Sequence, residues 1–109
     1  EPPVNGIFQT DTSGRQISHR QIPFGPANNG GPCHGLAWEN GKLWVSSNRL
    51  ESLVRLDPRT WQVDWMFPHT MLPDLKDRIH GVEFDPATGG LWQVTGTQKP
   101  DVPNYEGHP

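Results

Sequence analysis

Two histidines, His34 and His80, share a local context, because each is followed by glycine and then by an aliphatic residue. Imidazole is a ready ligand for zinc, copper or iron, and histidines that converge from separate segments can hold such an ion. A metal held there would polarise a substrate carbonyl or activate a water molecule. The alternative is that each His-Gly pair begins a strand, since the two histidines lack the short spacing that makes metal motifs specific. Both are candidate catalytic residues and metal ligands.

Other polar residues near these histidines could act on a ligand. Glu83 would supply a general base or a cation ligand, or else belongs to a solvated strand face. Arg78 would clamp an anionic substrate group, or else lies in an exposed, charged connector. Asn28 and Asn29 lie in the Gly- and Asn-rich segment 24–32 and are candidates for substrate binding, because loops often carry function. These residues do not identify a cofactor; a divalent transition metal or calcium is the expectation.

The only cysteine, Cys33, directly precedes His34 and could be an activated thiol or a soft ligand. The equivalent residue beside His80 is Ile79, which is apolar. This correspondence favours a small buried hydrophobic role for Cys33. A reactive thiol would need surroundings that lower its pKa.

The elements that position these residues follow from an internal repeat with a spacing of 46 residues. Matches occur along the whole chain at this one offset, which indicates a structural period. The matched positions are His34-Gly35-Leu36 with His80-Gly81-Val82, Trp38-Glu39 with Phe84-Asp85, Ile7 with Leu53, Asp11 with Asp57, Gln16 with Gln62, Ile17 with Val63 and, after a two-residue insertion, Leu43-Trp44 with Leu91-Trp92.

Each unit is predicted to consist of short antiparallel strands joined by tight turns. Asn40-Gly41 predicts a type I′ hairpin turn, and Pro58 favours a turn after Asp57. Pro68 ends the last strand, because proline cannot donate to a ladder. Four strands in about 35 residues, repeating every 46, match the size of a β-propeller blade. The predicted strands of the middle unit are 34–38, 43–46, 52–56 and 61–67.

Two segments of the middle unit, 34–45 and 54–60, resemble the blade consensus of a broad β-propeller group. This group includes the YVTN and NHL repeats, the gluconolactonase-like proteins and virginiamycin B lyase. The resemblance covers nearly the whole chain and implies a propeller fold. It implies no single activity, because the group includes lactonases, lyases, binding proteins and scaffolds.

The chain does not begin at the start of a predicted blade. Residues 6–23 match strands three and four of a blade, 34–68 form a complete blade, 80–97 match strands one and two, and 98–109 are a tail. The two half-blades lie on opposite sides of the whole blade, so each leaves an edge that one monomer cannot pair. Three chains would close a six-bladed ring and four an eight-bladed one. A homo-oligomer, with a trimer favoured, stands beside the alternative of a piece of a longer propeller.

Composition narrows the class of partner. Five tryptophans and four phenylalanines argue for a folded chain. The net charge of −3 and the pI of 5.9 give no basic surface for nucleic acid, and no apolar run approaches the roughly 20 residues of a membrane span. The chain begins at Glu1 with neither methionine nor an apolar signal core, which leader removal or excision would each produce. A periplasmic or secreted location is the expectation.

Two functions are consistent with these residues. The first, which we favour, is a small-molecule site at the mouth of a central propeller channel. There His34, His80 and Glu83 would support a metal-assisted lyase or hydrolase reaction, and Arg78 would hold the substrate. The second is a binding module for carbohydrate or another small ligand, with sites between blades lined by tryptophan and asparagine. An interaction scaffold built from the same blades is a third option.

Overall fold

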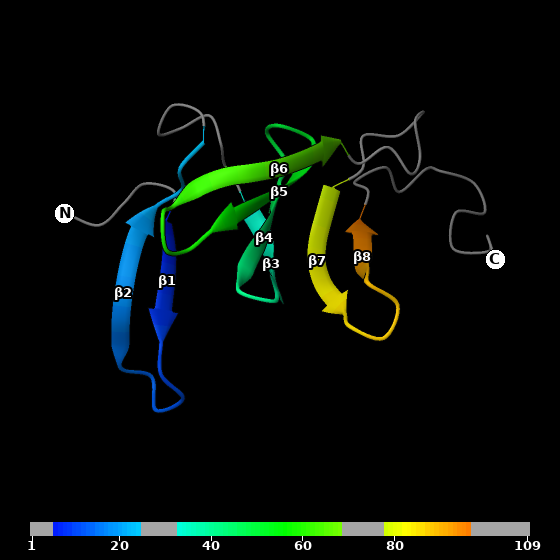
Figure 1. Ribbon diagram of the computed structural model, residues 1–109. Helices are drawn as coiled ribbons and strands as arrows, with labels where there is room; N and C mark the ends of the chain where they lie inside the picture. The colour runs from blue at the N-terminus through cyan, green and yellow to red at the C-terminus, as the bar shows by residue number, and fades with distance from the viewer. Residues whose placement is uncertain (1–5, 25–32, 69–77, 97–109) are drawn as a thin grey trace.

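The computed structural model describes residues 6–24, 33–68 and 78–96. Every regular element in these ranges is a β-strand (Figure 1), which confirms the all-β prediction. The same residues contain no helix with the length and apolar character needed to cross a membrane. The strands are β1 (Gly6–Thr10), β2 (Gln16–Gln21), β3 (Cys33–Glu39), β4 (Lys42–Ser47), β5 (Ser52–Asp57), β6 (Gln62–Pro68), β7 (Arg78–Asp85) and β8 (Gly90–Gly96).

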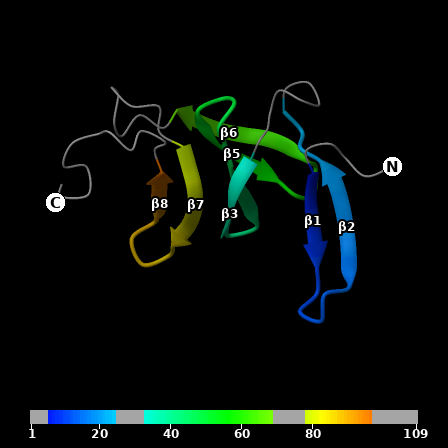
Figure 2. The same cartoon turned by 180° about the vertical axis from the view of Figure 1, so that it is seen from behind.

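The strands form three antiparallel sheets in chain order. Strands β1 and β2 make a hairpin, β3 to β6 make a four-stranded meander, and β7 and β8 make a second hairpin. Figures 1 and 2 show the four-stranded sheet between the two hairpins. The turn between β3 and β4 has positive φ at both central residues, 44° at Asn40 and 88° at Gly41, as a type I′ turn requires. The described strands form separate sheets and no closed barrel.

The backbone pairing repeats along the chain. In the β3–β4 pair Ala37 is opposite Trp44, and 46 and 48 residues later Glu83 is opposite Trp92 in the β7–β8 pair. All the residue pairs between β3 and β4 recur between β7 and β8 with the same offsets, including the irregularity near the start of β3 and β7. Strands β1 and β5 likewise carry a register shift at equivalent points. The sequence repeat is therefore also a repeat of strand register.

The core lies between the four-stranded sheet and the β7–β8 hairpin. Strand β7 runs along β3 and β4, and glycine permits this approach: a Cβ atom on Gly35 would lie 3.2 Å from the Cα atom of Gly81. Ser46 joins the strands, because its Oγ accepts from the Gly35 amide at 2.9 Å and donates to the Ile79 carbonyl at 3.2 Å. The buried apolar cluster consists of Ala37, Trp44, Leu53 and Ile79, with Phe67, Val82, Phe84 and Leu91 packed against it.

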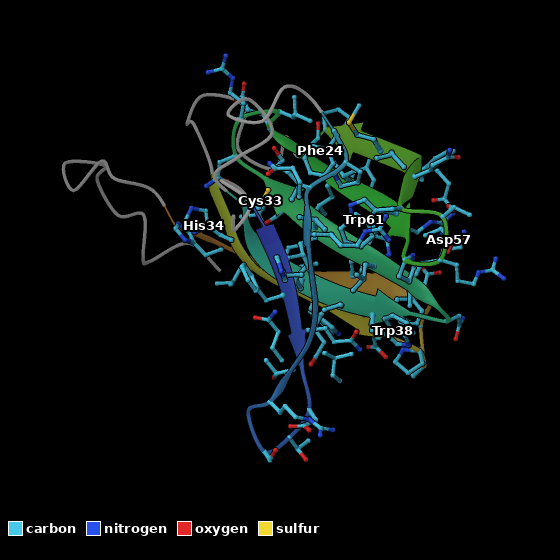
Figure 3. The ribbon with its side chains drawn as sticks, turned by 90° about the vertical axis from the view of Figure 1, so that its left-hand side faces the viewer. Phe24, Cys33, His34, Trp38, Asp57 and Trp61 are labelled. Atoms are coloured by element: carbon cyan, nitrogen blue, oxygen red, sulfur yellow. The ribbon has the colours of Figure 1, made fainter. Side chains whose placement is uncertain are left out.

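The β1–β2 hairpin contacts the four-stranded sheet through Trp61, which lies just before β6. The indole Nε1 of Trp61 donates to the carbonyl of Gln21 at 2.6 Å, and the Arg20 guanidinium lies 4.6 Å from the centroid of its ring. Figure 3, seen from the side of this hairpin, shows Trp61 and Trp38 on the part of the sheet behind the hairpin. Side chains on the hairpin itself are exposed, with Phe8 at 49% and Ile17 at 56%.

Gly35→Ala tests the close approach of β3 and β7. The new methyl group would meet the backbone of Gly81 and Val82 at 3.2 Å, and backbone cannot yield as a side chain can. We expect the free energy of unfolding in urea to fall by about 1–3 kcal/mol. Gly90→Ala is the matched control, because its Cβ atom would meet only the Thr88 hydroxyl at 3.4 Å. Equal stability of the two variants would contradict the tight contact.

Candidate functional site

The structure brings the two predicted histidines together where β3 and β7 run side by side. The ring centroids of His34 and His80 are 5.1 Å apart, with an angle of 53° between the planes, and both side chains are exposed. Each histidine falls within the irregular part of its strand register. In Figure 3 His34 lies beside Cys33 and far across the view from Asp57. We call His34 and His80 the histidine pair.

The spacing of the histidine pair suits a shared metal ion. Zinc binds imidazole nitrogen at about 2.0–2.1 Å, so two imidazoles on one tetrahedral ion have ring centroids about 5 Å apart. The described residues hold no group of three or more His, Cys, Asp or Glu side chains able to bind a metal. A metal on the histidine pair would therefore need a further ligand from outside these residues.

Glu83 does not join the histidine pair in such a group. It is exposed, lies opposite Trp92 in the β7–β8 register, and corresponds in the repeat to Ala37, which is in the core. Glu83 thus lies on the same face of the β7–β8 hairpin as Trp92. Asn28, Asn29 and the side chain of Arg78 lie outside the described residues, while the backbone of Arg78 begins β7.

Cys33 has surroundings that oppose reactivity. Its side chain is half-buried at the start of β3, and desolvation raises the pKa of the thiol from 9.0 to about 11. Burial disfavours the charged thiolate, so the thiol is protonated at neutral pH. These surroundings agree with the packing role that the correspondence with Ile79 suggested.

A cleft of about 540 Å³ opens between the four-stranded sheet and the β7–β8 hairpin. Trp44 forms its inner wall and is 5% exposed. The indole Nε1 of Trp44 donates to Glu39 at 2.7 Å, and the Arg55 guanidinium lies 5.6 Å from the ring centroid. Within the described residues, the buried Oε1 of Gln93 has no hydrogen-bond donor. We call this the Trp44 cleft; it is lined by Glu39, Trp44, Arg55, Trp65, Phe67, Phe84, Gly89, Leu91 and Gln93.

A network of charges fixes Arg55 in the wall of the Trp44 cleft. Its Nε donates to Asp64 at 2.9 Å, and its guanidinium lies 3.5 Å from Glu39. Lys42 also binds Asp64, and the hydrogen bonds from Lys42 and then Arg55 hold the pKa of Asp64 below its usual value. Solvent screens these partly exposed pairs, so their main effect is to orient the guanidinium. Sequence reasoning missed this network, although the Glu39–Trp44 pair has a repeat counterpart in Asp85–Trp92.

Comparison of the chain with protein-family models, with curated proteins and with solved structures gives no match.

The thiol of Cys33 provides a test of these local surroundings. With a pKa near 11 instead of 9.0, the thiolate fraction at pH 8 is about 100-fold smaller in the folded chain than in the unfolded chain. We expect alkylation by iodoacetamide to be slow in the native protein, to rise steadily between pH 8 and 11, and to become fast in urea. A native rate at pH 8 equal to the rate in urea would show that the thiol is neither desolvated nor protected.

Proposed function

We propose that the chain is a β-propeller segment whose functional site lies at the channel mouth, where the histidine pair binds a divalent transition metal that acts on a small polar ligand. The observation that carries this proposal is the 5.1 Å separation of two exposed imidazoles at equivalent positions of a repeat. Calcium prefers oxygen ligands, so a nitrogen pair favours zinc, copper or nickel.

The arrangement of the sheets supports the propeller part of the proposal. Strands β3 and β7, the first strands of successive units, run in close contact, whereas the described strands β5 and β6 make no close backbone approach to β7 or β8. Sheets that meet at their first strands and separate outward have the wedge shape of neighbouring blades. The equal registers of β3–β4 and β7–β8 support the same interpretation.

In the proposed reaction, His34 and His80 would hold the ion through their imidazole nitrogens. A metal bound in this way supplies Lewis acidity or a water of lowered pKa, as a lyase or hydrolase requires. Glu83 is not grouped with the pair in the described residues, so the proposed reaction assigns it no role. The class of reaction rests on the histidine pair and on the blade resemblance alone.

The Trp44 cleft supports a second function, the binding of a small polar ligand such as a carbohydrate. The unsatisfied Oε1 of Gln93 favours a ligand with a hydroxyl or amide donor, because a buried acceptor without a donor is unfavourable. Trp65, which is 58% exposed, offers an apolar ring face beside it. This function needs no metal, which separates it from the first.

Metal titration by calorimetry tests the histidine pair. We expect saturable binding of Zn²⁺ or Ni²⁺, and we expect His34→Ala and His80→Ala each to lower the affinity at least about tenfold, because one of two imidazole ligands is lost. His19→Ala is the matched control, since His19 is exposed but stacks on Phe8 instead. Calcium is expected not to bind. Equal affinity in all three variants would exclude the histidine pair as the metal site.

Sugar binding without metal tests the Trp44 cleft. If Gln93→Leu abolishes such binding, the result would favour the Trp44 cleft as the functional site.

A further inference from the structure

We propose that β8 of one copy of the chain pairs with β1 of a second copy, and that Trp92 of the first fills a cleft in the second. This inference shares with the proposed function only the propeller arrangement and does not depend on a metal.

Two strands of the chain, β8 and β1, each have one edge that could pair with a strand of another copy. Among the described strands, β8 pairs only with β7, and β1 pairs only with β2, so each leaves one edge without a strand. The four-stranded sheet separates the two hairpins (Figures 1 and 2), which prevents β8 from reaching β1 of the same chain. An unpaired edge presents backbone donors and acceptors that pair readily with another chain.

The pairing of β4 with β5 provides the template for the junction. Strand β8 is the repeat counterpart of β4, and β1 is the counterpart of β5. In the template Trp44 lies opposite Arg55, Val45 opposite Val54 and Ser46 opposite Leu53. The same register between β8 of one copy and β1 of the second makes an antiparallel pair. It places Trp92 opposite Gln9, Gln93 opposite Phe8, and Val94 opposite Ile7 of the second copy.

Trp92 makes the same kind of hydrogen bond as Trp44, but among the described residues no side chain buries its ring. Each indole Nε1 donates to a carboxylate at the end of the preceding strand, at 2.7 Å to Glu39 and 2.9 Å to Asp85. Trp44 packs edge-on against Phe67 at 5.7 Å and is 5% exposed, whereas Trp92 is 67% exposed. Val94 on the same face is 59% exposed. Exposed apolar side chains grouped on one sheet face indicate a contact surface.

The second copy has a cleft that could accept Trp92. This cleft has a volume of about 540 Å³ and lies between the β1–β2 hairpin and the four-stranded sheet. This Trp38 cleft corresponds to the Trp44 cleft, with Trp38 and Leu43 at the positions of Phe84 and Leu91. It lacks the inner wall that Trp44 provides, and Trp38 is consequently 59% exposed. The missing wall has one counterpart in the repeat, Trp92 of another copy. The Trp38 cleft is lined by Ile7, Phe8, Gln9, Ser18, Arg20, Leu36, Trp38, Leu43, Pro58 and Trp61.

A second copy is the occupant that the registers favour, because one chain carries both halves of the junction. Head-to-tail contacts of this kind close into a ring when the rotation allows, and three copies would give six blades. We therefore expect light scattering on a size-exclusion column to give the mass of three chains of 12.2 kDa each. A monomer at about 100 µM would overturn the proposal and assign the edges to a different partner or to further blades of a longer chain.

Cysteine cross-linking tests the register directly. In a Cys33→Ala background, Phe8→Cys protein is mixed with Gln93→Cys protein and oxidised. Residues directly opposite each other have Cβ atoms about 4.5–5.5 Å apart, so a covalent dimer is expected only in the mixture. The matched control replaces Phe8→Cys by Gln9→Cys, which points to the other face of β1. Equal cross-linking of both mixtures, or none in either, would overturn the proposed register.

Trp92→Ala tests the side chain that fills the cleft. Because Trp92 is exposed in one chain, its removal should leave circular dichroism unchanged while association weakens at least about tenfold, as for buried tryptophans at interfaces. Leu50→Ala, which removes an exposed apolar side chain between β4 and β5, should leave association unchanged. Unchanged association of Trp92→Ala would overturn the role of Trp92. Because these readouts are masses, loss of metal binding would leave them unaltered.

Discussion

Strands β3 and β7 can run side by side because Gly35 of one strand meets Gly81 of the other with no side chain between them. The histidines precede these glycines, so the same contact brings the two imidazoles within 5.1 Å. It also lets the Ser46 hydroxyl bridge the two strands, which satisfies a fully buried polar group. Core packing and candidate site therefore depend on one backbone approach, and a larger residue at Gly35 would disturb both.

That contact also explains why so much apolar surface stays exposed. Sheets held together at their first strands diverge toward their outer strands, so each outer face needs a further sheet to cover it. Trp65 on β6 is 58% exposed and Trp92 on β8 is 67% exposed, although both lie on strands that carry apolar faces. Such exposure is costly in water. The stability of the chain is therefore expected to rise when these exposed faces are covered.

The sequence predicted the strands well because their signals are local or periodic. Asn40-Gly41 specified its turn, and the 46-residue repeat placed His34 and His80 at equivalent points that proved to be neighbours. The charge network around Arg55 escaped prediction because it depends on register. A shift between β5 and β6 leaves Asp64 without a directly opposite residue, so that it meets both Arg55 and Lys42. Glu83 was difficult for the same reason, since its face is set by its partner Trp92.

Under the proposed exchange, the junction between copies repeats the core of one chain with altered side chains. Within a chain the four positions are Ala37, Trp44, Leu53 and Ile79. At the junction the counterparts are Glu83 and Trp92 of one copy with Ile7 and Cys33 of the next. Burying a carboxylate without a partner costs free energy, and a thiol buries less apolar area than isoleucine. The junction is therefore weaker than the internal packing, so a ring would open between copies while the four-stranded sheet of each chain stays folded.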